Sequence, residues 1–283
     1  MNSVNVPFKN ITLLFIIPSI LGLLLALSFD PYNIPFLPIL IITFFFLKND
    51  YIYKNYKKSL KFFFITGFIF GFSFFLTSIY WISNSISEFN EELVFLTPIP
   101  LILLPAVLAL FYGVMQMYNS LHWNNSKFRV LFFTSSWIIF ELLRSFLFTG
   151  FPWGLIAYTW SWSIQFVQIV SVIGVYGLSL LTILCSALIG LSFVKKENFI
   201  FLIVSILIMI FLFSYGLIRI KNYLTTQKPS KHIHLKIGQI STKDALLIIS
   251  RLPWVEKGSK TPFNDFDLLA ICSALNPFDS LYS

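Results

Sequence analysis

The chain has 283 residues, of which 57% are hydrophobic and only 11% are charged, whereas an ordinary soluble domain has about 25% charged residues. A soluble fold cannot cover so much apolar surface with polar groups, so the composition excludes a soluble globular protein and predicts one that faces lipid. The net charge of +8 does not indicate nucleic-acid binding, because the lysines and arginines gather in short segments between apolar runs, where they set membrane topology.

Seven apolar segments are candidates for helices that cross a bilayer, which takes about 20 mostly apolar residues. They span residues 11–29, 34–47, 61–83, 97–118, 130–148, 166–193 and 199–218. The second is short and contains Pro35 and Pro38, so it is expected to be tilted, broken or re-entrant, and the sixth is longer than one crossing requires. A tight turn predicted at residues 29–32 favours a helical hairpin over a cleaved signal peptide at the first segment.

The charges of the connecting segments predict the orientation of these helices. Basic residues follow the second, fourth and sixth segments: Lys48, Lys54, Lys57, Lys58, Lys61, Lys127, Arg129, Lys195 and Lys196. The alternate connections carry Asp30, then Glu88, Glu91 and Glu92, and finally, over residues 149–165, no charge. Because positively charged loops stay in the cytoplasm, the N-terminus is predicted to be cytoplasmic, and seven crossings place residue 219 and everything after it outside.

The composition changes after residue 218, where the chain becomes mixed and polar and contains several prolines. Residues 234–240 alternate loosely between apolar and polar and predict one short strand. The two cysteines, Cys185 and Cys272, are not spaced like a metal site or a disulfide framework, and the histidines form no ligand pattern with carboxylates or thiols. No metal and no cofactor are therefore expected.

The most informative stretch begins with Glu141 and Arg144 near the end of the fifth segment. Residues three apart share one helix face, and ionisable groups at membrane depth are costly, so they pair, face the bundle interior or serve a site. A structural ion pair that orders the helix and a functional role remain equally open. Gly150 and Pro152 are expected to end this helix at the outer surface.

Uncharged aromatic residues follow this helix: Trp153, Tyr158, Trp160 and Trp162. One interpretation is an ordinary aromatic belt at headgroup depth, and the other is an interfacial element beside a cleft through which lipid enters. Taken alone, the belt is favoured, because tryptophan is generally enriched at that depth. Trp81 at the end of the third segment is likewise expected to be an interface anchor.

Glycines inside the predicted helices suggest how the helices pack. Gly67 and Gly71 lie four apart in the third segment, a spacing that lets two helices approach closely. Gly174 and Gly177 in the sixth segment predict either close packing or a local kink.

Four blocks resemble, in order, the apolipoprotein N-acyltransferase family. FDPYNIPFLPIL, residues 29–40, resembles its first hairpin, and GFIFGFSFFLTSIYWISNSI, residues 67–86, its third helix. ELLRSFLFTGFPWGLIAYTWS, residues 141–161, resembles its signature stretch, and QIVSVIGVYGLSLL, residues 168–181, the block that follows. HLKIGQIS, residues 234–241, looks like the first strand of the family's nitrilase-like domain.

The resemblance implies an all-α polytopic membrane bundle followed by a nitrilase-like α/β domain on the outer face of the bacterial cytoplasmic membrane. Family members move an acyl chain from a phospholipid to the α-amine of the lipidated N-terminal cysteine of an apolipoprotein. They use a glutamate, a lysine and a cysteine, and the cysteine forms a thioester that the amine then attacks. By this resemblance, the residues that line or support the lipid-facing cleft here are Trp81, Glu141, Arg144, Pro152 and Trp153, and none of them can act as the nucleophile.

The resemblance ends after residue 241. Glu256 and Cys272 lack the family's catalytic setting, so no catalytic residue is identified. The expectation is a membrane domain at residues 1–218 and a truncated start of the periplasmic nitrilase-like domain at 219–283, inactive alone, with disorder after residue 241 as one alternative. The alternative function is a non-enzymatic membrane protein, such as a transporter or a lipid-binding assembly factor, although the sequence shows no internal repeat typical of transporters.

Overall fold

The computed structural model describes residues 12–56, 59–82, 98–123, 128–147, 152–194 and 199–226, and the regular structure within these ranges is entirely helical. In chain order the elements are η1 (Thr12–Ile16), α2 (Ile17–Ala26), α3 (Leu37–Tyr56), α4 (Leu60–Ser78), α6 (Pro98–His122), α7 (Arg129–Phe146), η3 (Ile156–Trp160), α8 (Ile164–Val167), α9 (Val170–Val194) and α10 (Phe199–Thr226). The predicted all-α class is confirmed over these residues. The chain divides into two units, 1–226 and 227–283, and the second unit lies outside the described residues.

Each of the seven predicted segments contains a helix, and four described helices are long and apolar enough to cross a bilayer. These are α4, α6, α9 and the part of α10 that runs from Phe199 to Tyr223. Residues Thr12–Ala26 form an apolar but shorter helical stretch, and α3 and α7 carry charged residues within them. The structure thus establishes four candidate spans, and the total of seven crossings stays a prediction.

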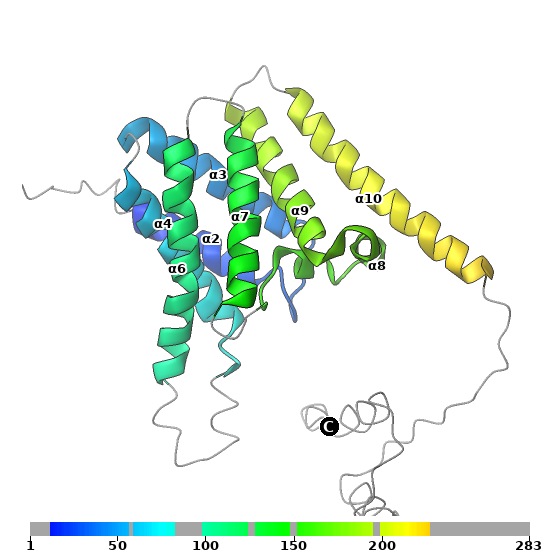
Figure 1. Ribbon diagram of the computed structural model, residues 1–283, viewed down its shortest axis with the longest axis horizontal. Coiled ribbons are helices and arrows are strands. Elements are labelled where there is room, and N and C mark those ends of the chain that lie inside the picture. Colours follow the sequence, from blue (N-terminus) through cyan, green and yellow to red (C-terminus); the bar gives the residue numbers. More distant parts are fainter. Residues whose placement is uncertain are drawn as a thin grey trace, which may run out of the picture. The chain divides into compact units, whose positions relative to one another are not determined.

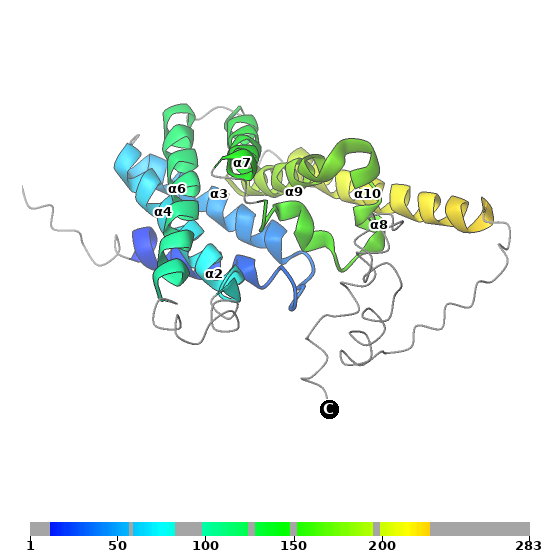
Figure 2. The ribbon, with the colours of Figure 1, turned by 60° about the horizontal axis from the view of Figure 1, so that its bottom comes forward.

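The helices of the first unit pack mainly against their neighbours in space. Figure 1 shows α6, α7 and α9 standing next to one another, with α10 beyond α9 at the edge. The most extensive contact joins α4 to α6, and α2 packs against α4. Helix α3 runs across the other helices in Figure 2 and contacts α9, so it joins the early helices to the later ones.

Glycine lets α4 and α6 approach closely, as the spacing of Gly67 and Gly71 predicted. A Cβ atom on Gly67 would lie 2.4 Å from the carbonyl oxygen of Tyr112, and one on Gly71 would lie 3.0 Å from the Tyr112 side chain. Because a methyl group has no room at 2.4 Å from a backbone atom, Gly67 sets the distance between the two helices.

Helix α3 differs from the sequence-based prediction in its length and continuity. It is one unbroken helix, because Pro38 stands in the first turn, where the missing N–H has no helical partner to lose. It continues past residue 47 to Tyr56, so Lys48 and Lys54 lie in the helix and not in a loop. Lys48 is buried over the ring of Phe45, 3.9 Å from the ring centroid.

The sixth predicted segment contains a kink, as one of the two interpretations of its glycines proposed. Gly174 has φ 71° and ψ 173°, which interrupts α9 one turn after its start. The short helix α8 precedes this kink. Helix α10 continues past residue 218 to Thr226, while the strand predicted at 234–240, Glu256 and Cys272 lie outside the described residues.

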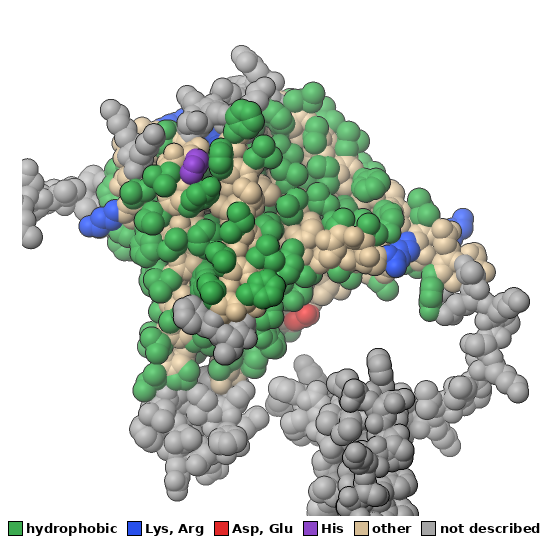
Figure 3. All heavy atoms as spheres, in the orientation of Figure 1, with side chains coloured by type: hydrophobic (Ala, Val, Ile, Leu, Met, Phe, Trp, Pro, Cys, Tyr) green, Lys and Arg blue, Asp and Glu red, His purple; other side chains and the backbone are tan. Residues whose placement is uncertain are grey.

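Aromatic rings fill the interior of the bundle. Trp137 of α7 contacts the rings of Phe45, Phe70, Tyr112 and Phe133, which come from four different helices including its own. The surface is also apolar: Figure 3 shows hydrophobic side chains over most of the face drawn, including α10. An apolar core inside an apolar surface is the pattern of a protein that lipid surrounds.

Candidate functional site

Glu141 lies inside the bundle on the last turns of α7, with only 2% of its surface exposed. Its Oε1 accepts hydrogen bonds from the indole Nε1 of Trp137 and from the backbone N–H of Ile156, both at 3.2 Å. The Arg144 guanidinium and the Ser179 hydroxyl are further electrostatic neighbours of this carboxylate. One carboxylate therefore links its own helix to the segment that follows it.

Arg144 is also buried and binds the same following segment. Its Nη1 donates a hydrogen bond to the carbonyl oxygen of Trp153, and its guanidinium carbon lies 5.2 Å from the ring centroid of Phe75 on α4. Gly154 adopts φ +68°, a conformation that favours glycine, and turns the chain between Trp153 and Ile156. Glu141 and Arg144 together hold both sides of this turn.

The turn brings the predicted site residues to one end of the bundle. Trp153 packs against Trp81, which follows α4, with ring centroids 5.1 Å apart and planes inclined by 47°. Trp81, Pro152 and Trp153 are all exposed, while Glu141 and Arg144 lie buried beneath them. We call Trp81, Pro152 and Trp153 the aromatic end. The structure brings the five residues together, and their contact with lipid remains a prediction.

The other aromatic residues of this segment divide between surface and interior. Trp160 is buried and its Nε1 donates to the Thr182 hydroxyl of α9 at 2.8 Å, so it anchors η3 inside the bundle. The N–H of Ala157 donates to the Ser179 hydroxyl at 2.9 Å. Tyr158, by contrast, is exposed. An aromatic belt of surface residues would not include Trp160.

A pocket opens between α6 and α7 beside Glu141. It is small, with room for about one water molecule, and its lining residues are Phe111, Tyr112, Met115, Trp137, Phe140, Glu141 and Arg144. The Tyr112 hydroxyl is buried among these residues without a hydrogen-bond partner. Sequence reasoning missed Tyr112, because nothing distinguishes a tyrosine inside an apolar run until its neighbours are known.

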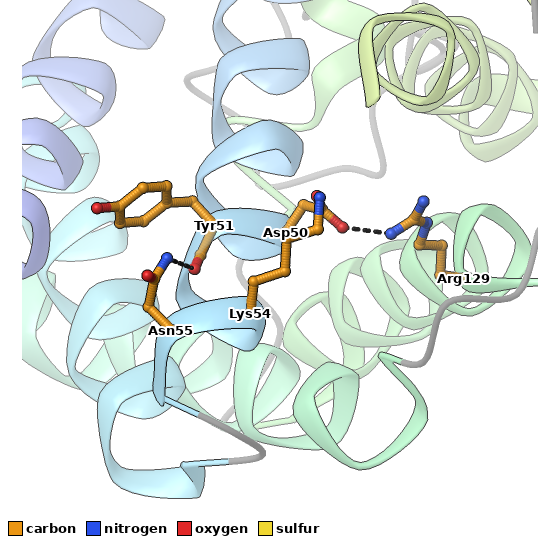
Figure 4. Close-up of polar contacts among 5 residues, drawn as sticks. All are labelled: Asp50, Tyr51, Lys54, Asn55 and Arg129. Atoms are coloured by element: carbon orange, nitrogen blue, oxygen red, sulfur yellow. Dashed lines mark hydrogen bonds and ion pairs between the residues drawn. The ribbon is translucent and has the colours of Figure 1, made fainter. Parts of the chain in front are cut away.

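A second buried polar group lies at the opposite end of α7. Arg129, the first residue of α7, forms an ion pair with Asp50 of α3, and Lys54 Nζ lies 2.7 Å from Asp50 Oδ2. Figure 4 shows the Asp50 carboxylate directed at Arg129, with Tyr51 and Asn55 on the same helix. The prediction that Lys54 and Arg129 are loop charges is wrong, because both are helical and Arg129 is buried.

Uncharged polar side chains continue this second group into the bundle. Asn49 of α3 donates to Gln116 of α6 at 2.8 Å, and Ser136 of α7 donates to Asn119 of α6 at 3.0 Å. Gln116 also accepts from Asn119 at 3.4 Å. These bonds join three helices without a charged group.

The described residues contain no group of three or more potential metal ligands. Cys185 is buried in α9, where its Sγ contacts the carbonyl oxygen of Ser205 in α10 at 3.8 Å. A thiol in that position cannot meet a substrate from outside the bundle. The geometry of the described residues therefore offers an aromatic surface and a pocket but no accessible thiol.

Comparison with known proteins points to one family. The family described as apolipoprotein N-acyltransferase N-terminal domain matches residues 21–188. Proteins named apolipoprotein N-acyltransferase are similar to the chain. That of Rickettsia bellii is 31% identical, in a match that covers 86% of this chain and 45% of the relative. That of Rickettsia prowazekii is 37% identical, in a match that covers 72% of this chain and 40% of the relative. The protein of Brucella melitensis is 37% identical over 41% of this chain and 22% of its own length. The chain spans less than half the length of these relatives.

Proposed function

Because the chain belongs to the apolipoprotein N-acyltransferase family, we propose that it serves the transfer of an acyl chain from a phospholipid to the N-terminal cysteine amine of bacterial lipoproteins. The observation that carries this proposal is the assembly of Trp81, Pro152 and Trp153 at one end of the bundle, above the buried Glu141 and Arg144. The partners are a phospholipid as acyl donor and a diacylglyceryl apolipoprotein as acceptor.

In this proposal the described bundle binds and orients lipid and does not supply the nucleophile. Exposed tryptophan rings suit the region between headgroups and acyl chains, because they are apolar with one polar N–H. Arg144 and Glu141 hold the segment that carries Trp153 through its backbone, so the ring keeps one place relative to Trp81. We assign the thiol chemistry to neither cysteine of the chain, since Cys185 is buried and Cys272 lacks the family's catalytic setting.

We further propose that the chain crosses the bacterial inner membrane seven times, with the N-terminus in the cytoplasm and residues 227–283 on the outer side. The alternation of basic and non-basic connections supports this orientation. The Asp50–Arg129 pair supports the crossing of α3 and α7, because paired charges at one end of two helices cost less in a membrane than single ones. The aromatic end then lies at the outer surface.

A protease-protection experiment tests the orientation. A tag after Ser283 should be removed when protease is added to intact spheroplasts, while a tag before Met1 should survive until the membrane is opened. Survival of the C-terminal tag would overturn the proposed topology.

Lipid cross-linking tests the proposed binding role. The purified chain is illuminated with a photoactivatable phosphatidylethanolamine, and cross-linked peptides are identified by mass spectrometry. We expect labelling of residues 152–162, and a diacylated lipopeptide should reduce it. Trp153→Ala should also lower this labelling. Tyr223→Ala alters an exposed ring on α10 and should leave the labelling unchanged. Labelling confined to α10 would contradict the proposal.

An acyl-transfer assay then separates the enzyme from a protein that only binds lipid. Membranes containing the chain receive a phospholipid donor and a diacylated lipopeptide, and the mass of the lipopeptide is then measured by mass spectrometry. Because no catalytic residue is identified in the chain, the chain alone should give no product that carries one more acyl chain on its α-amine. Appearance of this product would overturn the expected inactivity, and cross-linking at the aromatic end without it fits a bundle that binds lipid and does not supply the nucleophile.

A further inference from the structure

The turn between α2 and α3 contains two residues other than glycine in the left-handed backbone conformation. Asn33 has φ 46° and Phe36 has φ 59°. Asparagine enters this region readily, whereas a bulky aromatic residue there is a backbone outlier, because its Cβ crowds the following carbonyl oxygen. Phe36 is therefore strained, and strain of this kind persists only where surrounding contacts hold the residue in place.

The contacts that hold Phe36 come from the segment that follows α7. Its ring meets the rings of Trp160, Trp162 and Phe166, with centroids 5.7, 5.4 and 6.3 Å away and planes inclined by 82°, 67° and 86°. These are edge-to-face contacts, which are attractive because the positive edge of one ring meets the negative face of another. One side chain of the turn thus joins three rings that are distant in the sequence.

A hydrogen bond joins the same two segments. The Ser161 hydroxyl donates to Asn33 Oδ1 at 2.9 Å, at the surface of the bundle. Trp160 and Phe166 belong to a small apolar cluster that is separate from the main core and consists of Ile39, Ala157, Trp160, Phe166, Ile169, Leu178 and Leu212. Through these contacts the turn closes over one side of the small cluster.

The turn itself has little burial to stabilise it. None of the residues from Asp30 to Phe36, all of which the structure describes, is buried, and Phe36 is 46% exposed. Local stability follows the number of buried apolar contacts, so this turn should open at a lower free energy than the helices around it. The strain at Phe36 lowers that free energy further, because opening lets the backbone leave the left-handed region.

From these contacts we propose that residues 30–36 form a strained clasp, which closes over residues 156–166 and opens without unfolding of the helices. When closed, the clasp fixes η3 and α8 through the Phe36 ring and the bond from Ser161 to Asn33. When open, it uncovers the Trp160 ring and leaves η3 held by hydrogen bonds from α7 and α9. The clasp is a property of the fold and does not depend on the proposed acyl transfer.

Hydrogen exchange of the whole chain in detergent, measured for each peptide by mass spectrometry, tests the clasp. Phe36→Ala removes the ring but keeps a Cβ atom in the left-handed conformation, whereas Phe36→Gly removes both. Tyr32→Ala is the matched control, because it removes a ring from the same turn that is 66% exposed.

The amides of residues 156–163 should exchange about tenfold faster in Phe36→Ala than in the wild type, the effect of losing ring contacts at a half-exposed site. In Phe36→Gly the increase should be about fivefold smaller, since glycine adopts the left-handed conformation without strain. Tyr32→Ala should match the wild type, and the peptides of α4 and α6 should be unchanged in all three variants.

Equal exchange of residues 156–163 in the wild type and Phe36→Ala would overturn the proposal, as would an acceleration that extends equally to α4 and α6. Equal increases in Phe36→Ala and Phe36→Gly would show that the clasp is not strained and would overturn it as well.

The wild type alone gives a second test, which applies even where the Phe36 variants fail to fold. Local opening exposes little surface, so low concentrations of urea should leave the exchange of residues 156–163 unchanged. An exchange rate that rises with urea as steeply as that of α4 and α6 would show that this segment opens only together with the bundle, and would overturn the clasp.

Discussion

Glu141 accepts a hydrogen bond from the backbone N–H of Ile156, fifteen residues further along the chain, at 3.2 Å. The same oxygen accepts from Trp137, one turn earlier on α7, so it holds the segment after the helix against the helix itself. Arg144 adds a bond to the carbonyl of Trp153. The position of the exposed Trp153 ring thus depends on two ionisable side chains that are themselves buried.

Removing the carboxylate should destabilise this end of the bundle. Glu141→Ala leaves two buried donors unpaired, so the free energy of unfolding should fall by about 2–3 kcal/mol. Glu141→Gln keeps a carbonyl oxygen in place and should cost about 1 kcal/mol. Denaturant titration of the detergent-solubilised protein, followed by circular dichroism, measures both. Equal losses for the two variants would show that the hydrogen bonds to Oε1 do not determine the stability.

The two exposed tryptophans should be energetically coupled. Their rings lie 5.1 Å apart, and aromatic pairs of this kind contribute about 0.5–1.5 kcal/mol beyond the burial of their area. A double-mutant cycle with Trp81→Ala and Trp153→Ala should give a coupling energy in this range. Additive effects of the two substitutions would mean that each ring acts alone, as an ordinary interface anchor does.

The ion pair at the opposite end of α7 should depend on Asp50 far more than on Lys54. Asp50→Asn leaves the buried Arg129 without its counter-charge and should lower the free energy of unfolding by about 3–5 kcal/mol. Lys54→Ala removes a side chain that is 55% exposed and should cost about 0–1 kcal/mol. Thermal unfolding of both variants in detergent provides the comparison, and a similar loss for both would contradict the central place of the Asp50–Arg129 pair.

Adding a single methyl group at Gly67 should disturb the contact between α4 and α6. Its Cβ would lie 2.4 Å from the Tyr112 carbonyl oxygen, so the helices must separate, and an overpacked interior of this kind costs about 1–3 kcal/mol. Ser135→Thr adds one carbon at an exposed position of α7 and is the control, with an expected loss of a few tenths of a kcal/mol. Unfolding curves for the two variants that coincide would show that α4 and α6 can adjust to the methyl group.

Much of the helical framework could be predicted from the amino-acid order alone. The apolar segments coincide with helices, because the length of an apolar run and its flanking glycines and prolines act locally. The same local information placed Glu141 and Arg144 on one face of α7 and predicted close packing at Gly67. The prediction for α3 was wrong beyond residue 47, because charged residues such as Lys48 and Lys54 are typical of loops until their surroundings in the fold are known.

Contacts between distant residues could not be obtained in this way. Asp50 pairs with Arg129 across 79 positions, and Tyr112 and Glu141 line one pocket only because α6 and α7 lie side by side. The amino-acid order by itself determined an all-helical, lipid-facing bundle in the first part of the chain and the family to which the chain belongs, since apolar runs and motifs are properties of short segments. Only the tertiary structure decided which buried polar groups have partners and which pocket they line, because those depend on how the helices pack.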